Sequence, residues 1–140
     1  MSINFFNEDV SLPKLKKRKL ISWIKNVIQS EGKKVGQVSF IFCSDDYLLE
    51  VNKKYLNHDY YTDIITFDYV EENVIQGDIF ISVDRVKENS VTFRTIFEDE
   101  IHRILIHGIL HLIGYKDKLK KDKHLMTTKE DFYLNELKTS

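Results

Sequence analysis

The chain has 140 residues, of which 42% are hydrophobic, so its length and composition favour one domain, residues 1–140, with a substantial core. The formal net charge of −1 excludes a globally positive field as a means of binding nucleic acid, and the single cysteine, Cys43, excludes a disulfide framework or a multi-cysteine zinc site. No apolar stretch reaches the roughly 18 residues of a membrane helix, and the N-terminus lacks a signal-peptide layout. We therefore expect a cytoplasmic, monomeric protein without membrane attachment, in which Cys43 is buried.

Hydrophobic periodicity predicts strands and helices in a mixed order along the chain. In chain order, we expect a strand at 3–6, a helix at about 12–31, a strand at 38–43, a helix at 47–56, strands at 63–69 and 78–82 joined by a polar turn, and helices at 84–91, 97–113 and 121–137. Ser11 is the expected cap of the first helix, and Ser44 begins the start signature of the second. The order predicts an α+β (mixed α/β) fold, with a mixed sheet of about four strands packed with helices.

Two histidines in the predicted helix 97–113 carry the clearest chemical signal. His107 and His111 are four residues apart in an apolar run, which places both on one helix face, where they can bind one metal ion. Gly114 lets the chain leave the helix, so that Asp117 can return as a third ligand. Three ligands leave a position open for water, as in catalytic zinc sites, and we expect one Zn²⁺ here. The alternative is a pair of hydrogen-bonded core histidines.

The residue after His107 argues against peptide hydrolysis. In the helix-borne His-Glu-x-x-His motif of metalloproteases the glutamate is the general base, but this chain has Gly108, which cannot move a proton. The glycine can instead let backbone or substrate come close to the metal. His124 is a rival third ligand, although we favour an exposed position for it.

Three blocks resemble one known family in the same order along the chain. The histidine stretch is similar to the signature His-Gly-x-Leu-His-Leu-x-Gly-Tyr-Asp-His of the YbeY family of bacterial rRNA-processing endoribonucleases, and seven of its positions match: His107, Gly108, Leu110, His111, Leu112, Gly114 and Tyr115. A second block resembles the family at Asn52, Tyr55, Asp59, Thr62, Asp63, Ile64 and Phe67. A third resembles its Gly-Asp-Ile-x-Ile-Ser strand at Gly77, Asp78, Ile79, Ile81 and Ser82.

Two positions depart from the family pattern. Asp117 stands where the signature ends in a third metal-binding histidine, and a carboxylate should make a metal-activated water less acidic than a neutral imidazole would. Leu56 stands where the family usually has an arginine thought important for RNA cleavage, and leucine cannot stabilise a phosphate. Lys53, one helical turn earlier, is the candidate substitute and the only catalytic candidate that we name beyond the metal site.

The resemblance implies a single-strand-specific endoribonuclease that matures the 3′ end of 16S rRNA and takes part in ribosome quality control. Its partners would be single-stranded RNA and the ribosome or its small subunit. Lys116 and Lys118 lie in a lysine-rich segment that can bind phosphates, although the same segment can be a solvated loop. Tyr60 and Tyr61 can stack on unpaired bases or pack as surface aromatics, and the sequence does not choose between these roles.

Other functions stay open at this point. They are a zincin-like metalloprotease, a non-catalytic ribosome-assembly factor with a structural metal, and a non-haem iron protein, since two histidines and a carboxylate also bind Fe(II). Neither the general base nor the nucleophile, water or the adjacent 2′-hydroxyl, can be assigned from the sequence.

Overall fold

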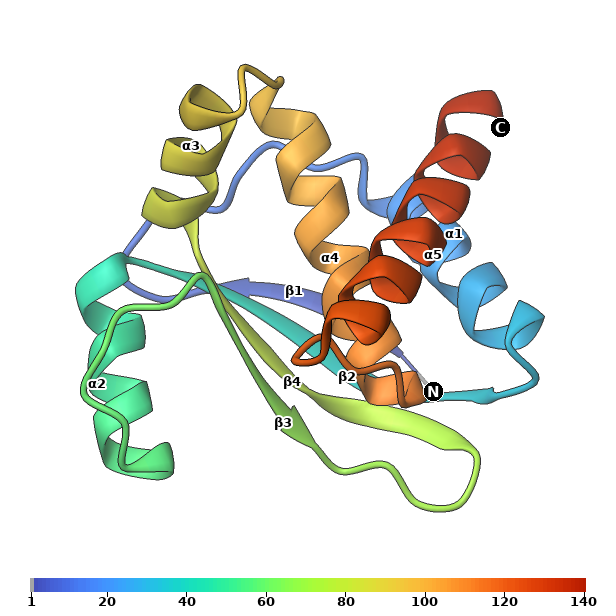
Figure 1. Cartoon of the computed structure of the whole chain (residues 1–140), viewed down its shortest axis with the longest axis horizontal. Helices are drawn as coiled ribbons and strands as arrows, with labels where there is room; N and C mark the ends of the chain where they lie inside the picture. The colour runs from blue at the N-terminus through green and yellow to red at the C-terminus, as the bar shows by residue number, and fades with distance from the viewer. Residues whose placement is uncertain (1) are drawn as a thin grey trace.

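Four strands form one mixed sheet in the computed structural model, which describes residues 2–140 (Figure 1). They are β1 (Ile3–Asn7), β2 (Lys34–Cys43), β3 (Ile64–Asp68) and β4 (Val74–Ser82). The order across the sheet is β1-β2-β4-β3; the first three run parallel, and β3 pairs antiparallel with β4 through the expected turn. The predicted α+β fold with a four-stranded mixed sheet is therefore confirmed.

Five helices accompany the sheet in the described part of the chain. They are α1 (Lys17–Ser30), α2 (Asp45–Leu56), α3 (Val83–Thr92), α4 (Phe97–Ile113) and α5 (Lys120–Thr139). Ser44 caps α2 as expected, since its side chain accepts a hydrogen bond from the backbone N–H of Tyr47. None of these helices is both long enough and apolar enough to cross a membrane.

The predicted start of the first helix is wrong. The helix begins at Lys17, after Lys16 in a non-helical conformation, and residues 11–16 are irregular, so Ser11 does not cap it. Pro13 disfavours the helical conformation at Leu12. Leu12 and Leu15 pack against the main core from this irregular segment, so tertiary contacts replace the helical turn that their spacing favours.

Helices cover the sheet on both faces. On one face α2 contributes Leu48 and Val51 to a small cluster with Cys43 and Ile65. Cys43 is fully buried as expected, and burial raises the pKa of its thiol to about 12. On the other face lies the main core, in which α4 contacts β3 and β4 as well as α1, α3 and α5 (Figure 1). Because neighbours surround α4, the helix is apolar on most of its circumference.

Gly108 sets the distance between α4 and the sheet. A Cβ atom at this position would lie 3.0 Å from two methyl carbons of Ile79 and 3.2 Å from Cδ1 of Ile64. The glycine is buried and faces these two strand residues. The missing side chain therefore serves close packing of helix on sheet, which is a different use from admitting substrate to the metal.

A carboxylate on the rim of the core fixes the segment after α4. Glu31 accepts hydrogen bonds from the hydroxyls of Tyr115 (2.5 Å) and Tyr133 and from Nζ of Lys129 (3.2 Å). Burial alone would raise the pKa of Glu31, but these three donors outweigh it and lower that pKa. Trp23 adds a bond from Nε1 to the backbone oxygen of Tyr133 (2.9 Å). These contacts tie the Gly114–Lys118 loop and α5 to α1, and so they position the loop that carries Asp117.

Candidate metal centre and its cleft

The last two turns of α4 bring His107 and His111 together as the sequence predicts. Their ring centroids are 4.6 Å apart, with the ring planes at 84°, and both side chains are partly exposed. The arrangement follows directly from the four-residue spacing on a helix. Both rings therefore present a nitrogen to the same space.

Gly114 turns the chain back toward these histidines. Its φ of 124° lies in a region that side chains rarely allow, and its N–H bonds to the carbonyl oxygens of Leu110 and His111 end the helix. After this turn, Oδ2 of Asp117 lies 3.3 Å from Nε2 of His107 and 3.2 Å from Nε2 of His111. All three donor atoms lie within 4.8 Å of one another.

These distances fit a metal ion bound between the three side chains. Tetrahedral zinc with bonds of about 2.0–2.1 Å separates its ligand atoms by about 3.3–3.4 Å, close to both nitrogen–oxygen distances here. Two imidazoles and one carboxylate are a known catalytic zinc set, and the same set binds Fe(II). The donors thus suit a divalent transition metal without specifying which one.

Glu130 of α5 contacts the His107 ring at Nδ1, the nitrogen that does not face Asp117. The sequence did not predict this contact. Oε2 of Glu130 lies 2.6 Å from Nδ1 of His107, and its Oε1 accepts from Nη1 of Arg103 at 2.8 Å. An ionised carboxylate only accepts, so the imidazole proton belongs on Nδ1 and the lone pair of Nε2 points toward Asp117. Carboxylates that orient metal-binding histidines in this way are a common feature of metal sites.

The negative charges around His107 and the burial of its ring have opposite effects on its pKa. Burial lowers the pKa of His107, but the hydrogen bond to Glu130 and the negative charges of Glu130, Asp117 and Asp63 outweigh it, and the pKa is raised. Burial also raises the pKa of Asp63, with His107 and Arg85 opposing it. The centre is therefore a partly dry site rich in negative charge, which favours a bound cation.

The three side chains open onto a cleft of about 570 Å³. The other lining residues, apart from Lys118, come from α2, from residues 57–63 between α2 and β3 (the α2–β3 segment) and from β3: Asn52, Leu56, His58, Tyr60, Thr62, Asp63, Ile64, Ile65, Thr66 and Asp68. Several of these positions belong to the second block of the family resemblance. The cleft thus brings two sequence blocks that are about fifty residues apart to one surface.

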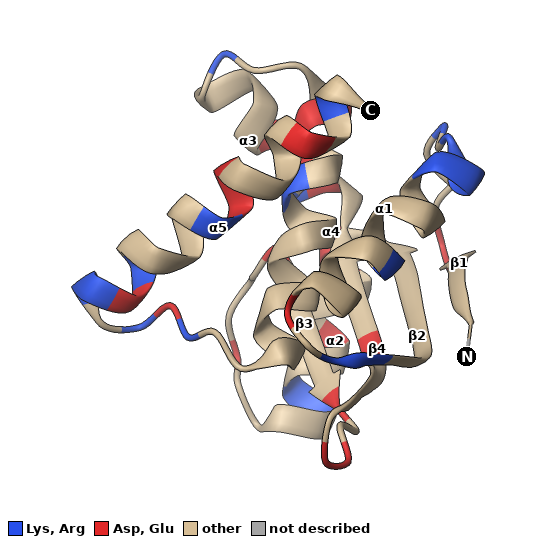
Figure 2. Ribbon diagram, turned by 90° about the vertical axis from the view of Figure 1, so that its right-hand side faces the viewer, with Lys and Arg blue, Asp and Glu red and all other residues tan. Residues whose placement is uncertain are grey.

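The predicted RNA-binding lysines occupy different places. Lys118 lines the cleft itself, and Lys116 lines an adjoining hollow of about 540 Å³ together with His111 and Asp117. Figure 2 shows basic residues along the segment that leads into α5 and along the first turns of this helix. Lys53 lies on the exposed side of α2, where its ammonium is 3.6 Å from carboxylates of both Glu50 and Asp59.

The other histidines lie outside the cluster. His124 is exposed on α5 and is not among the described residues that could share a metal ion, as expected. His102 packs edge-on against Trp23, and burial lowers its pKa. His58 is exposed and lines the cleft.

The fold and the site define a small α+β domain with a histidine–carboxylate cluster that could hold a metal ion beside an open cleft. The chain belongs to the family described as Endoribonuclease YbeY, which it matches over residues 3–138. A relative of that name from Parabacteroides distasonis is 53% identical over 131 residues, covering 94% of this chain and 92% of the relative. Another, from Bacteroides thetaiotaomicron, is 48% identical over 94% of this chain and 96% of its own length.

A solved structure shows the same fold. The solution structure of a protein from Thermotoga maritima superposes with a TM-score of 0.69 at 30% identity and covers 97% of this chain and 89% of its own. The sequence-based prediction of an endoribonuclease is thereby confirmed at the level of the family. Neither the protease nor the assembly-factor alternative receives support from these relatives.

Proposed function

We propose that this chain is a zinc-dependent endoribonuclease in which His107, His111 and Asp117 hold one Zn²⁺. The observation that carries the proposal is the meeting of three donor atoms, at nitrogen–oxygen distances of 3.2 and 3.3 Å, on the wall of a cleft large enough for a nucleotide. When bound, the ion would supply Lewis acidity to polarise a phosphoryl oxygen and to acidify the attacking group, either water or the adjacent 2′-hydroxyl.

The surrounding side chains have separate tasks in this proposal. Glu130 keeps the proton of His107 on Nδ1 and so leaves Nε2 free to bind the ion. Lys118 lines the cleft and supplies positive charge for a phosphate. Lys53 stays the proposed substitute for the family arginine at position 56. In that role it would have to exchange its contact with Asp59 for one with RNA.

The substrate class follows from the family. We propose single-stranded RNA, and specifically the 3′ end of 16S rRNA in the small ribosomal subunit, as the target in the cytoplasm, with the chain acting as a monomer. The lysines between position 116 and the first turns of α5 support contact with a polyanion despite the net charge of −1.

Metal analysis and RNA cleavage on the same samples test the proposal. We expect one equivalent of zinc in the wild type, loss of cleavage on chelation and recovery on adding Zn²⁺. His111→Ala and Asp117→Ala should lose both metal and cleavage, whereas His124→Ala, which alters an exposed histidine outside the cluster, should retain both. Cleavage that survives chelation and both ligand substitutions would refute the proposal, and a stoichiometric content of iron would correct the metal.

A further inference from the structure

Two aromatic rings of the α2–β3 segment line the same cleft as the three proposed metal ligands. His58 and Tyr60 both line the cleft, and their rings stack with centroids 5.1 Å apart and planes at 20°. The Tyr60 hydroxyl also lies 2.9 Å from Nδ1 of His58. Tyr60 nevertheless leaves 55% of its surface exposed. The pair is thus an aromatic surface that residues 2–140 leave partly uncovered.

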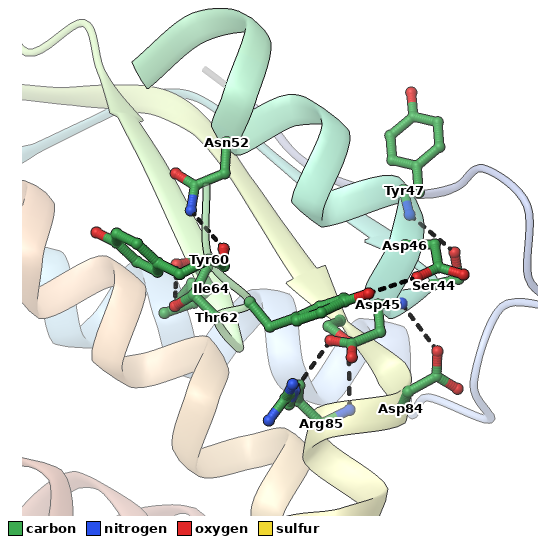
Figure 3. A network of polar contacts seen from close by, with 12 residues as sticks. Ser44, Asp45, Asp46, Tyr47, Asn52, Tyr60, Thr62, Ile64, Asp84 and Arg85 are labelled. Atoms are coloured by element: carbon green, nitrogen blue, oxygen red, sulfur yellow. Dashed lines mark hydrogen bonds and ion pairs between the residues drawn. The ribbon is translucent and has the colours of Figure 1, made fainter. Parts of the chain in front are cut away.

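Asn52 explains why both rings stand on the same wall. This side chain is buried, with 1% exposure, at the end of α2. The backbone oxygen of Asn52 accepts from the N–H of His58 at 3.1 Å. The side-chain Nδ2 of Asn52 donates to the backbone oxygen of Tyr60 at 2.9 Å (Figure 3). Asn52 therefore holds the backbone on both sides of Asp59, while the exposed face of the Tyr60 ring stays free for a ligand.

The neighbouring tyrosine is used differently. The hydroxyl of Tyr61 donates to Oδ1 of Asp46 at 3.1 Å, and the guanidinium of Arg85 lies 5.2 Å from its ring centroid. Arg85 is itself held by Asp45 at 3.0 Å (Figure 3). Tyr61 is thereby engaged with α2 and α3, whereas Tyr60 lines the cleft. The structure separates two adjacent tyrosines that the sequence leaves equivalent.

We propose that the His58–Tyr60 pair stacks on one unpaired nucleobase of an RNA strand lying in the cleft. The inference rests on the proposed function and adds the substrate feature that is recognised. A base has to leave a duplex before an aromatic ring can cover its face, so a stacking site favours single strands and tolerates any base. Leu56 lines the same wall and offers no charge to a phosphate, so this wall holds the strand through its bases.

RNA binding by the metal-free chain tests the proposal without cleavage. The probe is a fluorescein-labelled single-stranded RNA of mixed sequence, measured by fluorescence anisotropy in EDTA. Tyr60→Leu should weaken binding by roughly tenfold, within the usual range for one stacked base. Tyr60→Phe, which keeps the ring, should bind within about twofold of wild type. Tyr69→Leu is the matched control, because Tyr69 is also 55% exposed but is not among the cleft-lining residues, and it should change nothing.

An abasic site moved along a version of this RNA short enough to bind in one register gives a second test, and its first measurement uses the wild type alone. One position should cost wild type as much affinity as Tyr60→Leu does, and that position should cost the Tyr60→Leu variant nothing further. Unchanged affinity in Tyr60→Leu, or equal loss at every abasic position, would overturn the stacking site even if the wild type cleaves RNA. Tyr60-dependent binding by a chain that never cleaves RNA would instead overturn the proposed function and leave the stacking site standing.

Discussion

Replacing Glu130 by glutamine should weaken metal binding by changing the tautomer of His107. The glutamate accepts two hydrogen bonds, from Nδ1 of His107 at 2.6 Å and from Arg103 at 2.8 Å, and it is buried. A glutamine of the same shape has one acceptor oxygen. If that oxygen keeps the hydrogen bond from Arg103, the amide N–H₂ faces Nδ1 of His107 and donates to it. The neutral imidazole then carries its proton on Nε2, the atom that should bind the metal.

The expected magnitude is a 10- to 100-fold loss of metal affinity, or about 1.4–2.7 kcal/mol, the usual cost of removing such an orienting partner. The assay is a competition titration with a chromophoric zinc chelator, supported by ¹⁵N chemical shifts that report the tautomer of His107. Asp131→Asn is the matched control, because Asp131 also pairs with Arg103, at 2.7 Å, but lies on the exposed side of the arginine. Wild-type affinity in Glu130→Gln, or an equal loss in Asp131→Asn, would refute the reasoning.

Three further predictions concern the stability and reactivity of the fold. Gly108→Ala should gain about 1 kcal/mol from helix propensity but lose about 1–3 kcal/mol because its Cβ presses on Ile79. The free energy of unfolding in urea should therefore fall by about 1 kcal/mol, and a rise would contradict the close packing of Gly108 on Ile79. Because the pKa of Glu31 is lowered in the folded chain, its stabilisation is complete above the ordinary pKa of 4.5 and is lost as the pH falls further. Unfolding free energies from about pH 6 to pH 3 should therefore depend less on pH in Glu31→Gln, and equal slopes would exclude this role. Buried Cys43, with its pKa raised to about 12, should react with iodoacetamide only as fast as the chain opens, and rapid labelling of the native protein would be inconsistent with that burial.

Local spacing predicted the centre because its three proposed ligands are close in the sequence. The helix fixes His107 relative to His111. Gly114 ends the helix and turns the chain back, which places Asp117 three residues later beside the histidines, so no distant contact is needed. Glu130 was missed because its place depends on how α5 packs on α4, which no local pattern specifies. A signal did exist: Glu130 lies in line with the buried apolar positions of its own helix, where an acidic residue needs a partner.

The same distinction explains the other differences between prediction and structure. The first four residues of β2 were missed because residues 34–37 are largely polar, and they become strand only by pairing with the start of β4 across a bulge. Tyr60 and Tyr61 could not be told apart because they differ only in tertiary surroundings. The sequence therefore predicted geometry that depends on residues close together in the chain, but not contacts between helices and loops.

A crystal of the zinc-loaded protein, with anomalous diffraction recorded at the zinc edge, tests the central claim most directly. We expect one anomalous peak at about 2.0–2.2 Å from Nε2 of His107, Nε2 of His111 and a carboxylate oxygen of Asp117. A peak that excludes one of these three side chains, or zinc bound only elsewhere on the molecule, would contradict it.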